Sequence, residues 1–280
     1  MAGPIITLTT DFGASDPVVG AMKAVILGIN PHATLVDITH EVPPQDISGG
    51  AFLFDTAFPY FSPNTIHVLV VDPGVGTERR PIFLQGPTGC FVAPDNGLLS
   101  YALARAGVFL PTSEASSSGS VSVPSGWKAY HLTNDQYWHN PVSNTFHGRD
   151  VFAPAAAYLS RGVQPERMGA VIDTLRVFPI LQPQKKHRYL TGCVLRVDHF
   201  GNLITNVPAS SLADAHGSII VEVGGQKLHG LADSYQDGTP LLAILGSHGY
   251  LEISARSGNA AQALGLGVGA EVQVGLAPSP

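Results

Sequence analysis

Two residues that could act on a substrate, Asp72 and Arg79, lie in the segment 71–80, directly after an apolar stretch. Residues 65–71 are β-branched and almost continuously apolar, which is typical of a strand buried on both faces of a parallel sheet, and Pro73-Gly74 then ends it. Ligands in such folds bind beyond the carboxyl ends of the strands. This predicts an active-site loop, and the alternative is a surface turn with a capping Asp and a solvated Arg.

A third candidate is His147, in the segment Phe146-His147-Gly148-Arg149-Asp150, just ahead of an alanine-rich stretch that has the pattern of a helix. The ordinary pKa of histidine lies close to neutrality, so a modest shift leaves it neutral and basic while a nearby arginine stays charged. On its own, such a histidine more often sits at a helix entry and bonds to backbone. Together with Asp72 and Arg79, it forms a set that can act on a proton.

The elements that must position these residues alternate between strand and helix patterns in the first part of the chain. This predicts an α/β domain with a mainly parallel sheet over residues 1–170, and a flexible loop over the Ser/Gly-rich residues 113–126. The expected strands cover 4–9, 34–38, 65–71, 82–85 and 90–93, and the expected helices cover 16–29, 47–58, 96–106 and the residues after Arg149.

The rest of the chain changes character. Residues 171–187 contain prolines and a Lys-Lys pair with little periodicity, which predicts a linker between two domains. Residues 188–280 then contain short β-rich runs separated by Gly, Asp and Ser, and these predict a small β domain, a barrel or a sandwich. The expected strands there cover 189–197, 217–223, 241–245, 250–255 and 270–275.

Composition excludes several classes of protein. The 280 residues are 44% apolar and 13% charged, with a net charge of -6, so the chain can bury a core and has no basic surface for nucleic acid. The two cysteines, Cys90 and Cys193, lie apart in apolar runs and imply no disulfide framework. Neither a basic amino-terminal leader nor an apolar stretch of roughly 20 residues is present, so we expect a cytoplasmic protein with no membrane contact.

Acidic residues also mark the end of the first expected strand. Asp11 lies in Thr10-Asp11-Phe12-Gly13, which matches a kinase signature, but no Gly-rich loop or strand lysine precedes it. A carboxylate at a strand end can instead accept both hydroxyls of a ribose. The alternative is that Asp11 forms a turn and Asp16 caps the helix that follows.

The segment Asp198-His199-Phe200-Gly201-Asn202 ends the first strand of the β domain with a carboxylate, an aromatic ring and an amide. This combination suits a purine, because Asn can pair bidentately with an adenine edge, Phe can stack and Asp can hold an ammonium group. A plain turn is the alternative. Metal-dependent hydrolysis and a serine nucleophile are disfavoured, because neither HExxH nor G-x-S-x-G occurs.

Taken in order along nearly the whole chain, these segments, together with 93–99 and 247–261, closely resemble the S-adenosylmethionine hydroxide adenosyltransferases, the adenosine-forming hydrolases related to fluorinase and chlorinase. The resemblance implies an α/β amino-terminal domain, a carboxy-terminal β-barrel, and a homotrimer with sites between neighbouring subunits. It implies displacement at C5′ of S-adenosylmethionine by water or hydroxide, giving adenosine and methionine, with no metal and no organic cofactor.

The resemblance also assigns roles. Asp72, Arg79 and His147 would be the catalytic set, with Asp72 also touching the substrate. The other contacts it implies are Asp11 for the ribose hydroxyls, Asp16 and Asp198 for the methionine ammonium, Phe200 and Asn202 for adenine, and Ser247, Glu252 and the backbone near Ala255 for the rest of the pocket.

Departures from the halogenases bear on the chemistry. Asp72 and Val75 stand where those enzymes carry Tyr and Thr around the halide, and residues 85–90 leave no room for the fluorinase insertion, so halide chemistry is disfavoured. His248 replaces an arginine and Gln45 replaces a tryptophan, which leaves open how the methionine carboxylate and one ribose face are held. A chlorinase-like halogenase and a non-catalytic S-adenosylmethionine or adenosine binder are the alternatives.

Overall fold

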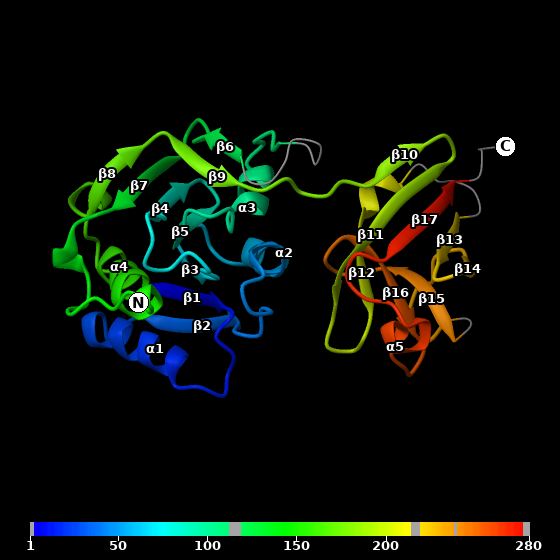
Figure 1. Cartoon of the computed structure of the whole chain (residues 1–280), viewed down its shortest axis with the longest axis horizontal. Helices are drawn as coiled ribbons and strands as arrows, with labels where there is room; N and C mark the ends of the chain where they lie inside the picture. The colour runs from blue at the N-terminus through cyan, green and yellow to red at the C-terminus, as the bar shows by residue number, and fades with distance from the viewer. Residues whose placement is uncertain (1–2, 112–118, 214–218, 238–239, 277–280) are drawn as a thin grey trace. The chain divides into compact units, whose positions relative to one another are not determined.

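The chain divides into two compact units, Met1–Ile180 and Leu181–Pro280, in a computed structural model that describes residues 3–111, 119–213, 219–237 and 240–276 (Figure 1). The first unit contains a mixed α/β sheet, and the second is an antiparallel, nearly closed β-barrel. The predicted fold class is therefore confirmed. None of the helices in the described residues is both long and apolar enough to cross a membrane.

The sheet of the first unit has four neighbouring parallel strands, with the remaining three added in antiparallel fashion. Its strands, in spatial order, are β2 (Thr34–Thr39), β1 (Ile5–Thr10), β3 (Ile66–Val70), β5 (Gly89–Pro94), β4 (Pro81–Gly86), β7 (Lys128–Leu132) and β8 (Gly169–Ile172).

Helices cover both faces of this sheet, which is why its central strands are apolar on both sides. On one face, helices α1 (Val18–Ile29) and α4 (Ala153–Ser160) pack against each other and onto β1 and β3 (Figure 1). On the other face, α2 (Ile47–Ala57) places Phe54 against His67 and Phe91, and α2 also contacts the short helix α3 (Ser100–Arg105).

The register of β1 and β3 decides where the site forms. Thr10, the last residue of β1, is paired with Val70, the last residue of β3. Because the two strands are parallel, the segments that begin at Asp11 and Val71 leave the sheet at the same edge.

The second unit buries its own apolar core inside the barrel, and β14 and β15 at the ends of the strand order contact each other. In spatial order the strands are β14 (Gln226–His229), β13 (Ile219–Val223), β17 (Glu271–Leu276), β11 (Tyr189–Val197), β12 (Leu203–Pro208), β16 (Tyr250–Ala255) and β15 (Leu241–Leu245). In addition, β10 (Gln184–Lys186) pairs with β11, and helix α5 (Ala260–Leu264) follows β16.

The expectation of a loop over residues 113–126 was wrong in part. Residues 119–122 of the expected loop form β6 (Gly119–Ser122), which pairs with β9 (Thr174–Val177) in a separate two-stranded sheet, while 112–118 lie outside the described residues. Within residues 171–187, β8 and β9 belong to the first unit and β10 belongs to the second, and the division between the units falls after Ile180. Strands β6, β8 and β9 pair with strands far away in the sequence, a contact that local composition does not encode.

Candidate active site

Asp72, Arg79 and His147 are in direct contact. Arg79 donates from Nε to Asp72 Oδ1 at 3.0 Å and from Nη2 to Asp72 Oδ2, and Nη2 lies 3.1 Å from His147 Nδ1. The Arg79 and Asp72 side chains are only 7% and 4% exposed. Two parallel N–H···O bonds fix the plane of the guanidinium group, so the arginine is held between the carboxylate and the imidazole.

A compact turn brings Arg79 back to Asp72. The amide of Val75 donates to the Asp72 carbonyl at 3.2 Å, and the Thr77 amide and hydroxyl both donate to the Gly74 carbonyl. Gly76 has φ of 76°, and a Cβ there would lie 2.4 Å from the Asn144 carbonyl oxygen, so only glycine fits. The turn therefore packs closely against the loop that leads to His147.

The contacts determine the protonation of the histidine. Arginine has only donors, so His147 Nδ1 must be an acceptor, and the neutral ring then carries its proton on Nε2. Burial and the Arg79 charge both lower the pKa of His147, in agreement with a neutral ring. Burial raises the pKa of Asp72, although Arg79 opposes that shift. Shifts of this kind, in opposite directions on neighbouring groups, are common at catalytic sites.

Two members of the trio, Asp72 and His147, border a cavity of about 320 Å³, within the range of small-molecule sites. Three of the predicted residues, Asp11, Asp72 and His147, line it, and the aromatic rings of Phe12 and Phe146 form part of its wall. Asp11 Oδ2 accepts a hydrogen bond from the Gln45 amide at 2.8 Å, and its other oxygen makes no described hydrogen bond.

Asp16 does not join this group. It is exposed, it lines neither of the two cavities described here, and it does not cap α1, whose N-cap position is taken by Pro17 with no side-chain hydrogen bond. The interpretation of Asp16 as a helix cap was therefore wrong, because the proline shifts the helix start to Val18.

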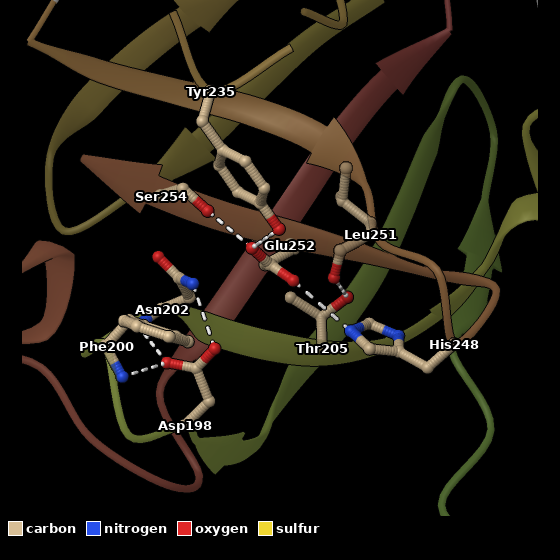
Figure 2. Close-up of polar contacts among 9 residues, drawn as sticks. All are labelled: Asp198, Phe200, Asn202, Thr205, Tyr235, His248, Leu251, Glu252 and Ser254. Carbon is tan, nitrogen blue, oxygen red and sulfur yellow. Dashed lines mark hydrogen bonds and ion pairs between the residues drawn. The ribbon is translucent and has the colours of Figure 1, made fainter. Parts of the chain in front are cut away.

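The second unit holds a larger cavity of about 590 Å³, and all six residues predicted for substrate binding in this unit line it. Its polar contacts are drawn in Figure 2. The lining residues are Asp198, Phe200, Asn202, Ile204, Tyr235, Ser247, His248, Glu252, Ala255, Ser257 and Gly258.

Asp198 organises one side of this cavity (Figure 2). Its Oδ1 accepts from the amides of Phe200 and Asn202 at 2.9 and 2.8 Å, and its Oδ2 accepts from Asn202 Nδ2 at 2.9 Å. The Phe200 ring is left 73% exposed, which suits a stacking surface. Asn202 Nδ2 uses one of its two N–H groups on Asp198, and its other N–H and its carbonyl oxygen make no hydrogen bond among the described residues, so both remain for a ligand.

Glu252 organises the other side. Its carboxylate accepts from the hydroxyls of Ser254 and Tyr235 at 2.6 and 3.0 Å and contacts His248 Nε2 at 3.2 Å (Figure 2). Burial acts to raise the pKa of Glu252, but these hydrogen bonds outweigh burial and the pKa lies below its ordinary value. Burial and the nearby carboxylate raise the pKa of Tyr235 to about 12.

Sequence reasoning did not find Tyr235, because it lies in a loop with no motif. His248 was noted only as a replacement for an arginine, and its contact with Glu252 was not predicted. The one sequence signal for that contact is the spacing of four residues between His248 and Glu252. Gly246 makes room for this pair, since a Cβ there would lie 2.5 Å from the His248 ring.

Both units match models of one protein family. Residues 6–169 match the S-adenosylmethionine (SAM) hydroxide adenosyltransferase N-terminal domain, and residues 192–273 match its C-terminal domain. The chain belongs to the SAM hydroxide adenosyltransferase family. The predicted family is therefore confirmed.

Relatives of known name support this membership. The chain is 36% identical over 276 residues to the (R)-S-adenosyl-L-methionine hydrolase of Salinispora tropica, covering 97% of both proteins. It is 31% identical over 285 residues to the enzyme of that name from Methanocaldococcus jannaschii, covering 96% of this chain and 95% of the relative. A fluorinase from an Actinoplanes species is 25% identical over 308 residues, covering 97% of both.

Among solved structures, an uncharacterized conserved protein from Thermotoga maritima superposes with a TM-score of 0.83 at 34% identity. The match covers 96% of this chain and 99% of that one. Both units of this chain therefore have the fold of the SAM hydroxide adenosyltransferase family. The trio lies in the region that matches the N-terminal domain, and the larger cavity lies in the region that matches the C-terminal domain.

Proposed function

We propose that this protein hydrolyses S-adenosyl-L-methionine to adenosine and L-methionine by attack of water or hydroxide at C5′. The observation that carries this proposal is the buried Asp72–Arg79–His147 contact beside a cavity that also contains Asp11. A protein that only bound the substrate would have no need for a neutral histidine coupled to a buried arginine. The names of the relatives, hydrolases at 31–36% identity, point to the same reaction.

The chemistry of the substrate explains why this set is sufficient. The leaving group is a sulfonium, so attack by hydroxide annihilates two opposite charges as methionine departs. Water stabilises the separated charges better than the neutral products, and a site with little water therefore favours the step. The demand on the protein is to generate and orient the nucleophile.

We assign the roles from the geometry of the trio. A water molecule that takes the place of the direct Arg79–His147 contact would be oriented by the guanidinium N–H groups and would lose its proton to His147 Nδ1. Arg79 Nη1 is buried and has no hydrogen-bond partner among the described residues. This arginine therefore keeps an N–H donor that can stabilise the negative charge that develops on the attacking water. Asp72 holds the guanidinium plane and balances its charge.

The cavity of the second unit supplies recognition in this proposal. Phe200 offers an aromatic face and the Asn202 carbonyl can accept from the adenine amino group, while Asp198 and Glu252 suit the positive charges of the substrate. Asp11 would bind the ribose hydroxyls through the oxygen that Gln45 leaves unbound. Asp16, which lines neither cavity, is retained for the methionine ammonium on the resemblance alone.

The test is to incubate the purified protein with S-adenosylmethionine in H₂¹⁸O and to identify the nucleoside by mass spectrometry. Adenosine with the label on its 5′ oxygen is expected. The His147→Ala variant is the control and should lose about 10²-fold in turnover, the scale of a general base. Formation of 5′-chloroadenosine in chloride buffer would support the halogenase alternative, and binding without turnover would support a sensor.

We also propose that the protein is a cytoplasmic homotrimer whose sites form between neighbouring subunits, as the resemblance implies. Mixing subunits tests this directly. If one subunit supplies His147 and its neighbour supplies Asp198, then subunits carrying His147→Ala and subunits carrying Asp198→Ala should regain activity when they are assembled together. Sites formed within single subunits would give no recovery in the mixture.

A further inference from the structure

Asp150 is a buried carboxylate that the proposed reaction does not use directly. It lies in a π-helical turn, Gly148–Phe152, that begins immediately after His147, and it is 0% exposed. It lines neither cavity. Burying a charged group is costly unless it is fully paired, so a specific role for Asp150 is expected.

The contacts of Asp150 tie down the loop that leads to His147. Its carbonyl accepts from the amide of His139 at 2.8 Å, and its Oδ2 accepts from the amide of Ser143 at 2.8 Å. Its own amide donates to the carbonyl of Phe146 at 3.1 Å. One residue therefore bonds to the beginning, the middle and the end of the loop, and the residue directly after that loop is His147.

The carboxylate is also held in its charged form. Burial acts to raise the pKa of Asp150, but hydrogen bonds from Arg149, at 2.6 and 3.0 Å, and from Ser143 outweigh burial and keep the pKa low, with His139 adding a smaller favourable charge. The guanidinium of Arg149 lies 5.0 Å from the ring centroid of Phe146, which lines the cavity.

Several charged groups surround the His147 imidazole. Arg79 and Asp72 face it from the turn after β3, Asp11 lines the same cavity from the end of β1, and Asp150 lies on the turn that follows His147. Arg79 disfavours the protonated ring, whereas Asp72 and Asp150 favour it. Asp150 thus acts on His147 through both position and charge, from outside the cavity.

We propose that Asp150 is a positioning residue, which anchors the loop that ends at His147 and places a fixed negative charge near the imidazole. The proposal rests on the proposed hydrolysis, in which His147 takes the proton of the attacking water. It predicts that changing Asp150 alters turnover and its pH dependence, while substrate binding changes little.

Two variants with opposite effects on charge provide the test. Asp150→Asn removes the negative charge, so the pKa of His147 should fall and the acid limb of the pH–turnover profile should move to lower pH. Arg149→Gln removes the counter-charge and leaves Asp150 less neutralised, so the acid limb should move to higher pH. Asp150→Asn should also lower kcat by about 10- to 100-fold through misplacement of His147, with a much smaller change in KM.

Asp55→Asn is the matched control. Asp55 is also a buried carboxylate, 3% exposed, and it is paired with Arg105, but it lines neither cavity. It should leave the acid limb in place. An acid limb that stays at the same pH in both Asp150→Asn and Arg149→Gln would overturn the proposal, since a purely structural role predicts lost turnover with no opposite shifts.

A second readout separates this inference from the proposed function. The titration of the His147 ring protons by NMR, assigned with His147→Ala, reports the same shifts without any turnover. An inactive wild-type protein would contradict the proposed hydrolysis, whereas unchanged His147 titration in the variants would contradict the role of Asp150. If Asp150→Asn does not fold, the direction of the shift in Arg149→Gln, whose side chain is 33% exposed, decides the matter.

Discussion

Replacing Arg79 by methionine should damage both chemistry and stability, and the stability loss should depend on pH. Methionine keeps an unbranched apolar stem but removes the guanidinium group from a pair whose side chains are only 7% and 4% exposed. Removing one partner of a buried ion pair costs about 3 to 5 kcal/mol when the other stays charged. Turnover should fall by about 10²-fold or more, because the donor to the nucleophile is lost.

The pH dependence follows from the carboxylate left behind. Burial already raises the pKa of Asp72 in the folded protein, and without Arg79 only the smaller effects of His147 and the Gly74 amide oppose that shift. The folded state of Arg79→Met then binds a proton more readily than the unfolded chain. Its stability is greatest below the ordinary pKa of the carboxyl and is lost as pH rises through the raised pKa, by about 1.4 kcal/mol for each pH unit of the shift.

Urea denaturation at pH 5 and pH 8, with turnover measured by chromatography, checks both parts. The double variant Asp72→Asn/Arg79→Met removes both charges of this pair, so it should regain stability at pH 8 and remain inactive. Arg105→Met, which breaks the pair of Asp55 with an arginine that is 48% exposed, is the control and should keep its turnover per folded molecule. Turnover within threefold of wild type in Arg79→Met, or recovery of activity in the double variant, would refute the reasoning.

Three further outcomes are expected. Asp11→Asn should weaken binding of both S-adenosylmethionine and adenosine by about 1 to 3 kcal/mol in calorimetry, since its ribose contact exists before and after reaction; unchanged adenosine affinity would show that the pocket is misplaced. Asp72→Ser should admit some chloride to the site while hydrolysis slows, because a carboxylate about 4 Å from an anion repels it by about 4 kcal/mol at an effective dielectric near 20. Formation of 5′-chloroadenosine as a major product of the unmodified protein would contradict this prediction. Burial lowers the pKa of His67 from 6.5 to about 4, so the free energy of unfolding should fall by about 2 to 3 kcal/mol as pH drops from 7 to 4.5, because the unfolded chain takes up a proton that the folded chain does not. His67→Phe should remove that pH dependence in urea titrations, and an unchanged dependence in this variant would reject the prediction.

The sequence predicted an element accurately where the burial of successive residues follows a simple pattern. Strands β1 and β3 were predicted within one residue of their bounds because both lie in the centre of a sheet covered on both faces, which buries nearly every residue of each strand. Pairing between distant segments leaves no such pattern. Strand β6 alternates partly buried and exposed residues and contains two serines, so only its contact with β9, about 55 residues further along, makes it a strand.

The candidate site shows the same division. The residue types of Asp72, Arg79 and His147 indicate their chemistry, and the parallel register explains why Asp11 and Asp72 meet. How their hydrogen bonds are used could not be predicted. The contact with Arg79 selects the tautomer of His147, and a bond to Asp198 uses one of the two amide N–H groups of Asn202; both depend on orientations that only the folded loops establish.

The negative charges of the larger cavity favour binding of the proposed substrate over binding of the nucleoside product. In the larger cavity, the carboxylates of Asp198 and Glu252 each accept three described contacts from protein groups, so they are held in place before a ligand arrives. A preorganised negative site attracts a substrate that carries both a sulfonium and an ammonium charge. After displacement the sulfonium charge no longer exists, and adenosine is neutral. In the proposed reaction, the carboxylates that we assign to substrate binding therefore contribute much less to binding of the nucleoside product, and release becomes easier without any change in the shape of the cavity.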